Sequence, residues 1–365
     1  MGTTPAFTSA SCGEVCGYFD RVMQLRLLSS AQVRFLPRHE YLPDGRLRSL
    51  ATGEIHELKV RKRIVDATYA DSRIPACSPP PFEVASDAHC IGPAELVSRD
   101  EPPEGYVIVG GGKTAMDTCQ WLLSEGVDSE RITWIRPRDM WLLNRVYFQG
   151  GQFVREVAEG TAQQMEAAAK CDTTQEFFEE CAQTGVMLSL DPTATPTMMR
   201  GATSHELEIA PLRNVERVVR LGHVQRVERD RILLERGEIA TSPGHLHIHC
   251  AASGVTTRPP RKIFAADRIT LQAVRIVSPS FSAALIGFLE GSGRDDVENT
   301  STRQFDRREM TVSVSTEWIL QGFATAQPRS MVFRCTTWRP ERDRSSSCAT
   351  AGRAIAARGV INCGR

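Results

Sequence analysis

The sequence predicts an α/β fold, and three observations predict it. An apolar strand at 106–109 is followed at once by a glycine-rich turn and a helical pattern, and then by a second apolar strand at 132–135. Residues 215–239 show the short alternating runs of a β-meander. A further strand-like run follows at 246–250. Strands that alternate with helices are typical of a parallel sheet covered by helices.

The composition is that of a globular protein without a strong electrostatic preference. The 365 residues are 41% hydrophobic and 24% charged, and 44 basic residues balance 44 acidic ones. This length is enough for two packed domains, and the balanced charge excludes a general attraction to nucleic acid or anionic membranes. No apolar run is long enough to span a membrane, and the first residues lack the pattern of a signal peptide. We therefore expect a cytoplasmic protein with reduced cysteines and with neither a nucleic-acid nor a membrane partner.

The N-terminal hundred residues are expected to hold one helix and several short strands. Apolar residues at helical spacing indicate a helix over 13–28. We expect strands at 33–36, 46–50, 58–60 and 63–68. The turn Pro43-Asp44-Gly45 would join the first two strands as a hairpin. Proline-rich residues 74–103 are expected to form a linker.

The glycine-rich turn carries the strongest functional signal. Gly110-Gly111-Gly112-Lys113-Thr114-Ala115 matches Gly-x-Gly-x-x-Ala directly after a strand and before a helix at about 114–125, which Gly126 would end. In this motif the first glycine allows a tight turn, the second lets the backbone approach a pyrophosphate, and Ala115 keeps the helix close to the sheet. Thr114 would open the helix, whose free N–H groups favour phosphate. The pattern predicts a Rossmann-type dinucleotide-binding domain.

The residues after the second strand bear on which dinucleotide is bound. Arg136-Pro137-Arg138 stands where an acidic residue would bind the ribose hydroxyl of NAD. Arg136 would instead pair with the 2′-phosphate of NADP, and Arg138 would also hold the nucleotide, so NADP is favoured and NAD stays possible. The alternative is that both arginines are solvated surface charges. Lys113 would either neutralise a cofactor phosphate or pair with Asp117 one turn later.

The rest of the chain is predicted in less detail. We expect helices at about 152–170 and 173–184, with Asp172, Thr173 and Thr174 as candidate N-caps, and a helix near 281–289. The strands of the meander are expected at 218–221, 224–227 and 232–234. His245, His247 and His249 alternate on one face of a strand, which favours a polar strand face over a metal site because such side chains do not converge. After about Gly291 the periodicity is lost and the tail is expected to be atypical.

Several stretches resemble two-dinucleotide flavoproteins, the group that holds flavin-containing monooxygenases and pyridine nucleotide-disulfide oxidoreductases. The resemblance is carried by 110–117, 134–139 and 141–145, and it extends over about 18–290. It implies an NAD(P) domain at 101–250 inserted into an FAD domain formed by 1–100 and 251–290, with 291–365 as the atypical tail. Thr68 and Gly254, where the chain passes between these domains, would bind the flavin cofactor, and residues 270–272 and 281–282 would lie near it.

The resemblance implies an oxidoreductase in which NADPH reduces FAD, which then reduces an unknown small-molecule substrate or electron acceptor. The group begins with its own FAD-binding strand and glycine motif, whereas the early glycines here are Gly2, Gly13 and Gly17, with no strand before them. The FAD-binding Rossmann-like domain is therefore expected to be incomplete. This leaves open a truncated, inactive homologue that only binds NADP(H). A dehydrogenase that uses nicotinamide alone is disfavoured, because neither Tyr69 nor Tyr147 has a lysine four residues on.

Overall fold

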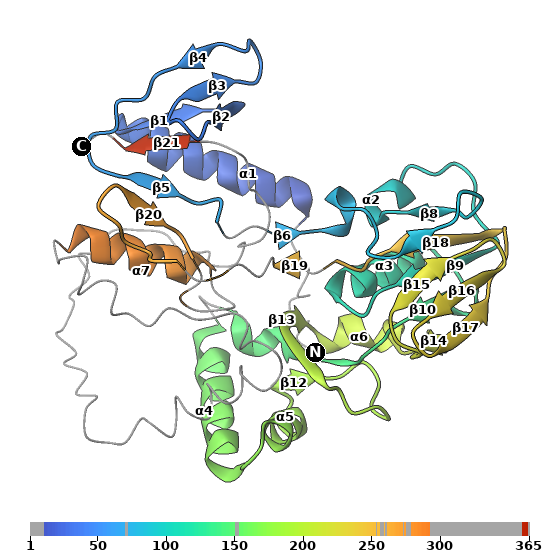
Figure 1. The fold of residues 1–365 in the computed structure, drawn as a ribbon. Helices are drawn as coiled ribbons and strands as arrows, with labels where there is room; N and C mark the ends of the chain where they lie inside the picture. Colours follow the sequence, from blue (N-terminus) through green and yellow to red (C-terminus); the bar gives the residue numbers. More distant parts are fainter. Residues whose placement is uncertain are drawn as a thin grey trace. The chain divides into compact units, whose positions relative to one another are not determined.

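The chain folds as two compact units, and the second is inserted in the sequence of the first (Figure 1). The computed structural model describes residues 11–69, 72–149, 153–252, 254–255, 259, 261–272, 274, 279–292 and 360–363. Of these, unit 1 holds the residues up to 69, those from 261 to 292, and 360–363. Unit 2 holds the described residues from 72 to 259.

Unit 2 is built around a five-stranded sheet in which all paired strands are parallel. Across the sheet the strands are β14 (Val218–Val219), β10 (Ile132–Ile135), β9 (Gly105–Val109), β18 (His245–His249) and β8 (Cys90–Ile91). From the central strand β9 the chain proceeds outward through β10 to β14, and it then returns to β18 on the other side of β9. The order of strands thus reverses beside β9. This parallel sheet, together with the helices of the unit, confirms the expected α/β class.

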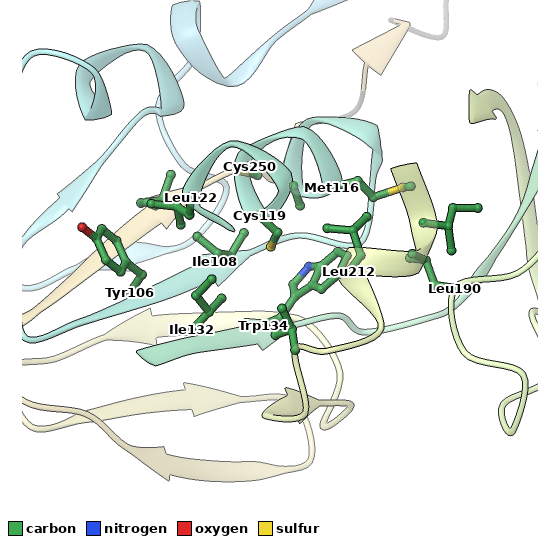
Figure 2. Packing of buried hydrophobic residues seen from close by; sticks show 14 of the residues in the cluster. Tyr106, Ile108, Met116, Cys119, Leu122, Ile132, Trp134, Leu190, Leu212 and Cys250 are labelled. Carbon is green, nitrogen blue, oxygen red and sulfur yellow. The ribbon is translucent and has the colours of Figure 1, made fainter. Parts of the chain in front are cut away.

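Alternate residues of the sheet enter two different cores, as the two-residue period of a strand requires. Ile108 and Trp134 face a helical layer, and Figure 2 shows them beneath the side chains of α3 (Lys113–Ser124). Val107 and Val109 face the opposite side and pack on the meander. Both faces of the sheet are therefore covered, which explains why β9 reads as a continuous apolar run.

The helical layer confirms the helix expected after the glycine turn. Met116, Cys119 and Leu122 of α3 are buried against the sheet. Gly126 follows the helix with φ +82°, a backbone conformation that favours glycine, so it ends the helix as expected. The same unit contains the short helices α2 (Pro93–Leu96) and α6 (Glu206–Leu212). It also contains 3₁₀ turns at Pro75–Cys77, Ser129–Arg131 and Arg145–Phe148.

The meander forms a separate four-stranded sheet on the other face. Its strands are β17 (Gly237–Ala240), β16 (Arg231–Leu234), β15 (Val224–Val227) and β7 (Glu83–Val84). Two expectations are corrected here. The strand expected to open the meander is β14, and it belongs to the main sheet. The expected linker at 74–103 instead supplies β7 to this sheet and β8 to the main sheet, because two-residue strands leave no periodicity to detect.

The residues between β10 and β14 in the sequence form a further layer of unit 2. It has a three-stranded sheet of β12 (Met187–Leu188), β11 (Met140–Asn144) and β13 (Met198–Ser204). The helices α4 (Val154–Lys170) and α5 (Thr174–Gln183) confirm the two that the sequence predicts. Thr173 caps α5 in a capping box with Glu176. Trp141, Phe177 and Phe178 form the core of this layer.

Unit 1 joins residues from both ends of the sequence. α1 (Cys12–Val22) continues into a π-helical turn (Met23–Leu27) and a 3₁₀ turn (Leu28–Ser30), close to the expected helix. The other elements are β1 (Val33–Leu36), β2 (His39–Tyr41), β3 (Leu47–Ser49), β4 (Ile55–His56), β5 (Ile64–Asp66), β20 (Arg268–Thr270), α7 (Pro279–Gly291) and β21 (Val360–Cys363). β5 and β20 pair in parallel, and Arg63 pairs with Glu290 of α7 at 2.8 Å.

Some expectations for unit 1 are corrected. The predicted turn lies in a hairpin, but the hairpin joins β2 to β3, and β1 pairs with β21. The strand expected at 58–60 is absent, and the third strand of this sheet is β4. The helix expected near 281–289 is confirmed as α7. Of the tail that follows 292, only β21 lies among the described residues.

The chain enters and leaves unit 2 through two short strands that pair with each other. β6 (Ser72–Arg73) enters the unit, β19 (Gly254–Val255) leaves it, and the two are antiparallel. Within the described ranges no helix is both long and apolar enough to cross a membrane.

Candidate functional site

The glycine loop lies where three parallel strands end. The amide of Gly110 donates to the carbonyl of Ile135 at the end of β10 (3.0 Å), and the amide of Cys250 donates to the carbonyl of Val109 (2.8 Å). The loop therefore follows β9 between the carboxyl ends of β10 and β18, at the point where the strand order reverses. Open α/β sheets bind their ligands at this position.

The first two glycines of the loop are required by packing. Gly110 has φ +140°, and a Cβ there would lie 3.0 Å from both the carbonyl carbon and the oxygen of Cys250. A Cβ on Gly111 would lie 3.0 Å from the carbonyl oxygen of Arg138 and 3.2 Å from Cγ of Arg136. Because these neighbours are mostly backbone atoms, they cannot move aside as the end of a side chain would. Neither position needs a ligand to explain its glycine.

Gly112 is different, because nothing in the described protein requires a glycine there. Its φ is −93°, which any residue adopts, and an added Cβ would meet no atom within 4 Å. The missing side chain instead leaves open space directly before the first turn of α3. A glycine that packing does not require is consistent with close approach of a ligand.

The N-terminus of α3 faces this space without a side-chain cap. The N-cap residue is Gly112, so no hydroxyl or carboxylate accepts from the first N–H groups. Ala115 is fully buried, which brings the helix close to the sheet as predicted. The carbonyl of Thr114 accepts a hydrogen bond from the hydroxyl of Thr118 (2.8 Å). Exposed N–H groups and the helix dipole make this end of α3 attractive to an anion.

Lys113 takes part in an ion-pair network beside this helix end. Its ammonium pairs with Asp117 and lies 3.9 Å from Glu208 of α6. Glu208 accepts hydrogen bonds from Arg145 and from the hydroxyl of Ser204, both 2.9 Å long. Burial alone would raise the pKa of Glu208, but the hydrogen bond and the charge of Arg145 outweigh it and lower that pKa. The charge of Lys113 is thus balanced by protein carboxylates.

Arg136 and Arg138 have contrasting environments. Arg136 is 3% exposed, with its guanidinium carbon 4.9 Å from the ring centroid of Trp134. It lies beside Asp139 and Asp191, which also accept hydrogen bonds from Arg220 (2.7 and 2.6 Å). Arg138 is exposed. A role for Arg136 in binding a 2′-phosphate stays a prediction, and the structure gives its guanidinium protein partners instead.

The sequence pattern did not indicate a role for Trp134, which hydrogen-bonds to the glycine loop. Its indole N–H donates to the carbonyl of Gly110 at 2.8 Å, and its side chain is fully buried. In Figure 2 it lies under α3, next to Leu212. The only signal was its place in the second strand, where a tryptophan reads as ordinary core. Asp191 and Arg220 were missed because they are distant in the sequence.

The three alternating histidines lie on the face of β18 that the meander side covers. His247 is 1% exposed, with Nδ1 2.9 Å from the carbonyl of His89 and Nε2 3.0 Å from the hydroxyl of Thr241. His249 is also buried, with Nε2 3.2 Å from the carbonyl of Ser78. The described residues contain no group of three or more side chains placed to hold a metal ion. The polar strand face that the sequence favours is thus a buried one.

Thr68 and Gly254, which the resemblance would place at a flavin, belong to different units. The amide and hydroxyl of Thr68 in unit 1 both donate to Oδ1 of Asp66, at 3.0 and 2.8 Å. Gly254 in unit 2 has φ +66° and pairs with Arg73. The contacts of each residue are local to its own unit.

Comparison with known proteins identifies relatives but no activity. The chain is 43% identical over 291 residues to uncharacterized proteins of Mycobacterium tuberculosis and Mycobacterium bovis, a match that covers 79% of this chain and 53% of each relative. The chain therefore spans about half the length of these curated relatives. No family model matches the sequence. The relatives' names assign them no function, so a functional assignment depends on the geometry of the glycine loop.

Proposed function

We propose that this chain is an NADPH-binding oxidoreductase and that the parallel sheet of unit 2 is a Rossmann-type dinucleotide-binding domain. Gly112 and the N-terminus of α3 hold the pyrophosphate. Bound NADPH supplies a hydride to an electron acceptor. The chain's own contribution is to bind and orient this donor at the carboxyl end of β9.

The observation that carries the proposal is the contrast among the three glycines. Gly110 and Gly111 are explained by packing against backbone at 3.0 Å, whereas Gly112 borders open space before an uncapped helix. The carboxyl end of the central strand, a helix N-terminus and a glycine that packing does not require lie at the same place. This combination is what a pyrophosphate requires, since it must approach the backbone closely and accept hydrogen bonds from it.

The charges after β10 support NADP over NAD. The backbone of Arg138 packs on Gly111, and its side chain is exposed, so the residue lies next to the loop with a solvent-accessible cation. Asp139, the nearest carboxylate in the sequence, is buried and accepts a hydrogen bond from Arg220. An acidic residue free to bind the ribose hydroxyl of NAD is thus missing from the described part of this turn. Arg138 is the residue we assign to the 2′-phosphate.

The resemblance to flavoproteins names FAD as the acceptor, but the N-terminus of α1 in unit 1 does not fit a flavin pyrophosphate. The N-terminus of α1 is closed by a capping box, in which Ser11 accepts from the amide of Glu14 and Glu14 accepts from the amide of Ser11. An N-terminus satisfied in this way has fewer N–H groups left for a phosphate. We therefore derive no step through a flavin.

The ion pairs beside the glycine loop favour a second candidate, a chain that binds NADP(H) without turnover. The cation and carboxylates around the described start of α3 are engaged with one another, which leaves no evident acid or base for catalysis. Hydride transfer between cofactors needs none, so the two candidates differ in whether an acceptor is held.

A spectroscopic titration of the full chain separates these candidates. FAD is added first, unbound FAD is removed, and NADPH is then added while the visible flavin band is recorded. Retained flavin that bleaches with NADPH supports the oxidoreductase, with Gly112→Ala as the control in which bleaching needs about tenfold more NADPH. A chain that retains no flavin but melts at a higher temperature with NADPH supports the binding-only candidate. No effect of NADPH on either readout contradicts both.

A further inference from the structure

The guanidinium of Arg136 is buried and already compensated. Its Nε lies 2.9 Å from Oδ1 of Asp139, and one Nη lies 3.9 Å from Oδ2 of Asp191. Both carboxylates are shared with Arg220, whose bonds to them are 2.7 and 2.6 Å long. A 3% exposed cation with two carboxylates beside it has little open surface for a ligand phosphate.

Arg136 contacts the glycine loop by two routes. Its aliphatic stem packs on the loop directly, because Cγ would lie 3.2 Å from a Cβ on Gly111. Its guanidinium lies over the ring of Trp134, 4.9 Å from the centroid, and the indole N–H of that ring donates to the carbonyl of Gly110 at 2.8 Å. A cation over the face of an indole attracts the ring, and burial strengthens the attraction.

Stability alone gives a poor account of this cluster. Although Nε of Arg136 and Oδ1 of Asp139 are 2.9 Å apart, neither atom makes a hydrogen bond of good geometry among the described residues. Burial lowers the pKa of Arg136, and the charge of Asp139 opposes this only in part. Replacing such buried ion pairs by apolar residues is often neutral or stabilising. Holding the loop is a role that an apolar residue could not supply.

We propose that Arg136 is a positioning residue, which fixes the glycine loop through Trp134 for NADPH and NADH alike. Arg138 is then the arginine that distinguishes the two nucleotides. The inference rests on the proposed function for its effect on binding, but the contact with Trp134 can be tested without any nucleotide.

The nucleotide test measures the Kd of NADPH and of NADH for the full chain and three variants. Arg136→Met and Trp134→Phe each weaken both nucleotides by a similar factor, about five- to tenfold, the value of one hydrogen bond to the loop. The double variant is no weaker than either single one, because both changes break the same chain of contacts. Arg138→Met is the control and weakens NADPH alone. An Arg136→Met variant that weakens NADPH and leaves NADH unchanged overturns the proposal.

The second measurement is hydrogen exchange of the Trp134 indole N–H by ¹⁵N NMR, without nucleotide. The chain has five tryptophans, and the spectrum of Trp134→Phe identifies the resonance. Arg136→Lys, which keeps the charge and loses the planar guanidinium, is expected to exchange this proton at least about tenfold faster than the wild type. Equal exchange rates contradict the positioning role. If the wild type binds neither nucleotide, the proposed function fails, while the exchange rates still decide the role of Arg136.

Discussion

The three glycines of the loop allow folding and ligand binding to be separated by single methyl groups. Gly110→Ala introduces a Cβ 3.0 Å from two backbone atoms of Cys250, at φ +140°. Backbone strain of this kind costs about 1–3 kcal/mol, and overpacking costs a similar amount. We expect the free energy of unfolding to fall by about 2–6 kcal/mol, and nucleotide binding to be lost with the fold.

Gly112→Ala adds the same methyl group where no described atom lies within 4 Å. Alanine is a poorer N-cap than glycine by about 0.5–1 kcal/mol, and it recovers about 0.4–1 kcal/mol because it restricts the unfolded chain. The stability is therefore expected to stay within about 0.5 kcal/mol of the wild type. A displaced pyrophosphate loses at least one charge-assisted hydrogen bond, worth about 1.5–3 kcal/mol, so the Kd of NADPH rises about tenfold or more.

The two variants are compared by urea unfolding and by NADPH titration followed through tryptophan fluorescence. Opposite profiles are expected, with Gly110→Ala defective in stability and Gly112→Ala defective only in binding. This expectation is refuted if Gly112→Ala binds NADPH as tightly as the wild type, since the open space before α3 would then have no role in binding. It is also refuted if Gly112→Ala loses as much stability as Gly110→Ala.

Three further predictions concern the scaffold. Burial lowers the pKa of His247, and the hydrogen bond to His89 opposes this shift only in part. The stability that His247 contributes is therefore full above its unfolded pKa of about 6.5 and falls at lower pH. The urea concentration at the unfolding midpoint should be lower at pH 5.5 than at pH 8, and the difference should be smaller in His247→Asn. Burial raises the pKa of Cys250 to about 11, whereas Cys12 and Cys16 are exposed. Thiol labelling mapped by mass spectrometry should therefore modify Cys12 and Cys16 before Cys250, and early labelling of Cys250 would contradict its burial. In α4, Gly160→Ala places a Cβ 2.6 Å from Cβ of Tyr147, so the free energy of unfolding in urea should fall by about 1–3 kcal/mol. In α7, the Cβ of Gly287→Ala meets nothing within 4 Å, so this variant should be as stable as the wild type or more stable.

The parts of the fold that were predicted correctly have strong local signals. The strand, glycine turn and helix at 106–125 follow from residues that are adjacent in the sequence, and Gly126 marks the end of the helix. The capping box of Thr173 and Glu176 likewise marks the start of α5. In each case the residues that define the element lie within about one or two turns of it, which is the range that propensity and capping cover.

The parts that were missed depend on distant residues. β8 is a two-residue strand in a proline-rich stretch, and only its pairing with β18, far along the chain, makes it part of the main sheet. β11 and β13 are longer, and they were missed because their sheet forms across two intervening helices. Short strands acquire their identity from their partners, and no local period reveals them.

The candidate site shows the same division between local and distant information. The positions of Gly110, Gly112 and Ala115 follow from the motif, and the structure gives each a distinct environment. Burial of Arg136 depends on Asp191 and Arg220, which lie more than fifty residues further along the chain. The sequence predicts Arg136 for the 2′-phosphate because it directly follows the strand, and it gives no sign that Arg136 is buried, since burial is a property of the assembled sheet.

Isothermal titration calorimetry of the full chain with NADPH tests whether unit 2 binds this nucleotide at the glycine loop. The account predicts saturable binding of one nucleotide per chain, competed by 2′,5′-ADP, which carries the phosphate that we assign to Arg138. Binding should weaken in Gly112→Ala while that variant unfolds at the urea concentration of the wild type. A folded wild-type chain that shows no saturable NADPH binding at millimolar concentration would contradict the account.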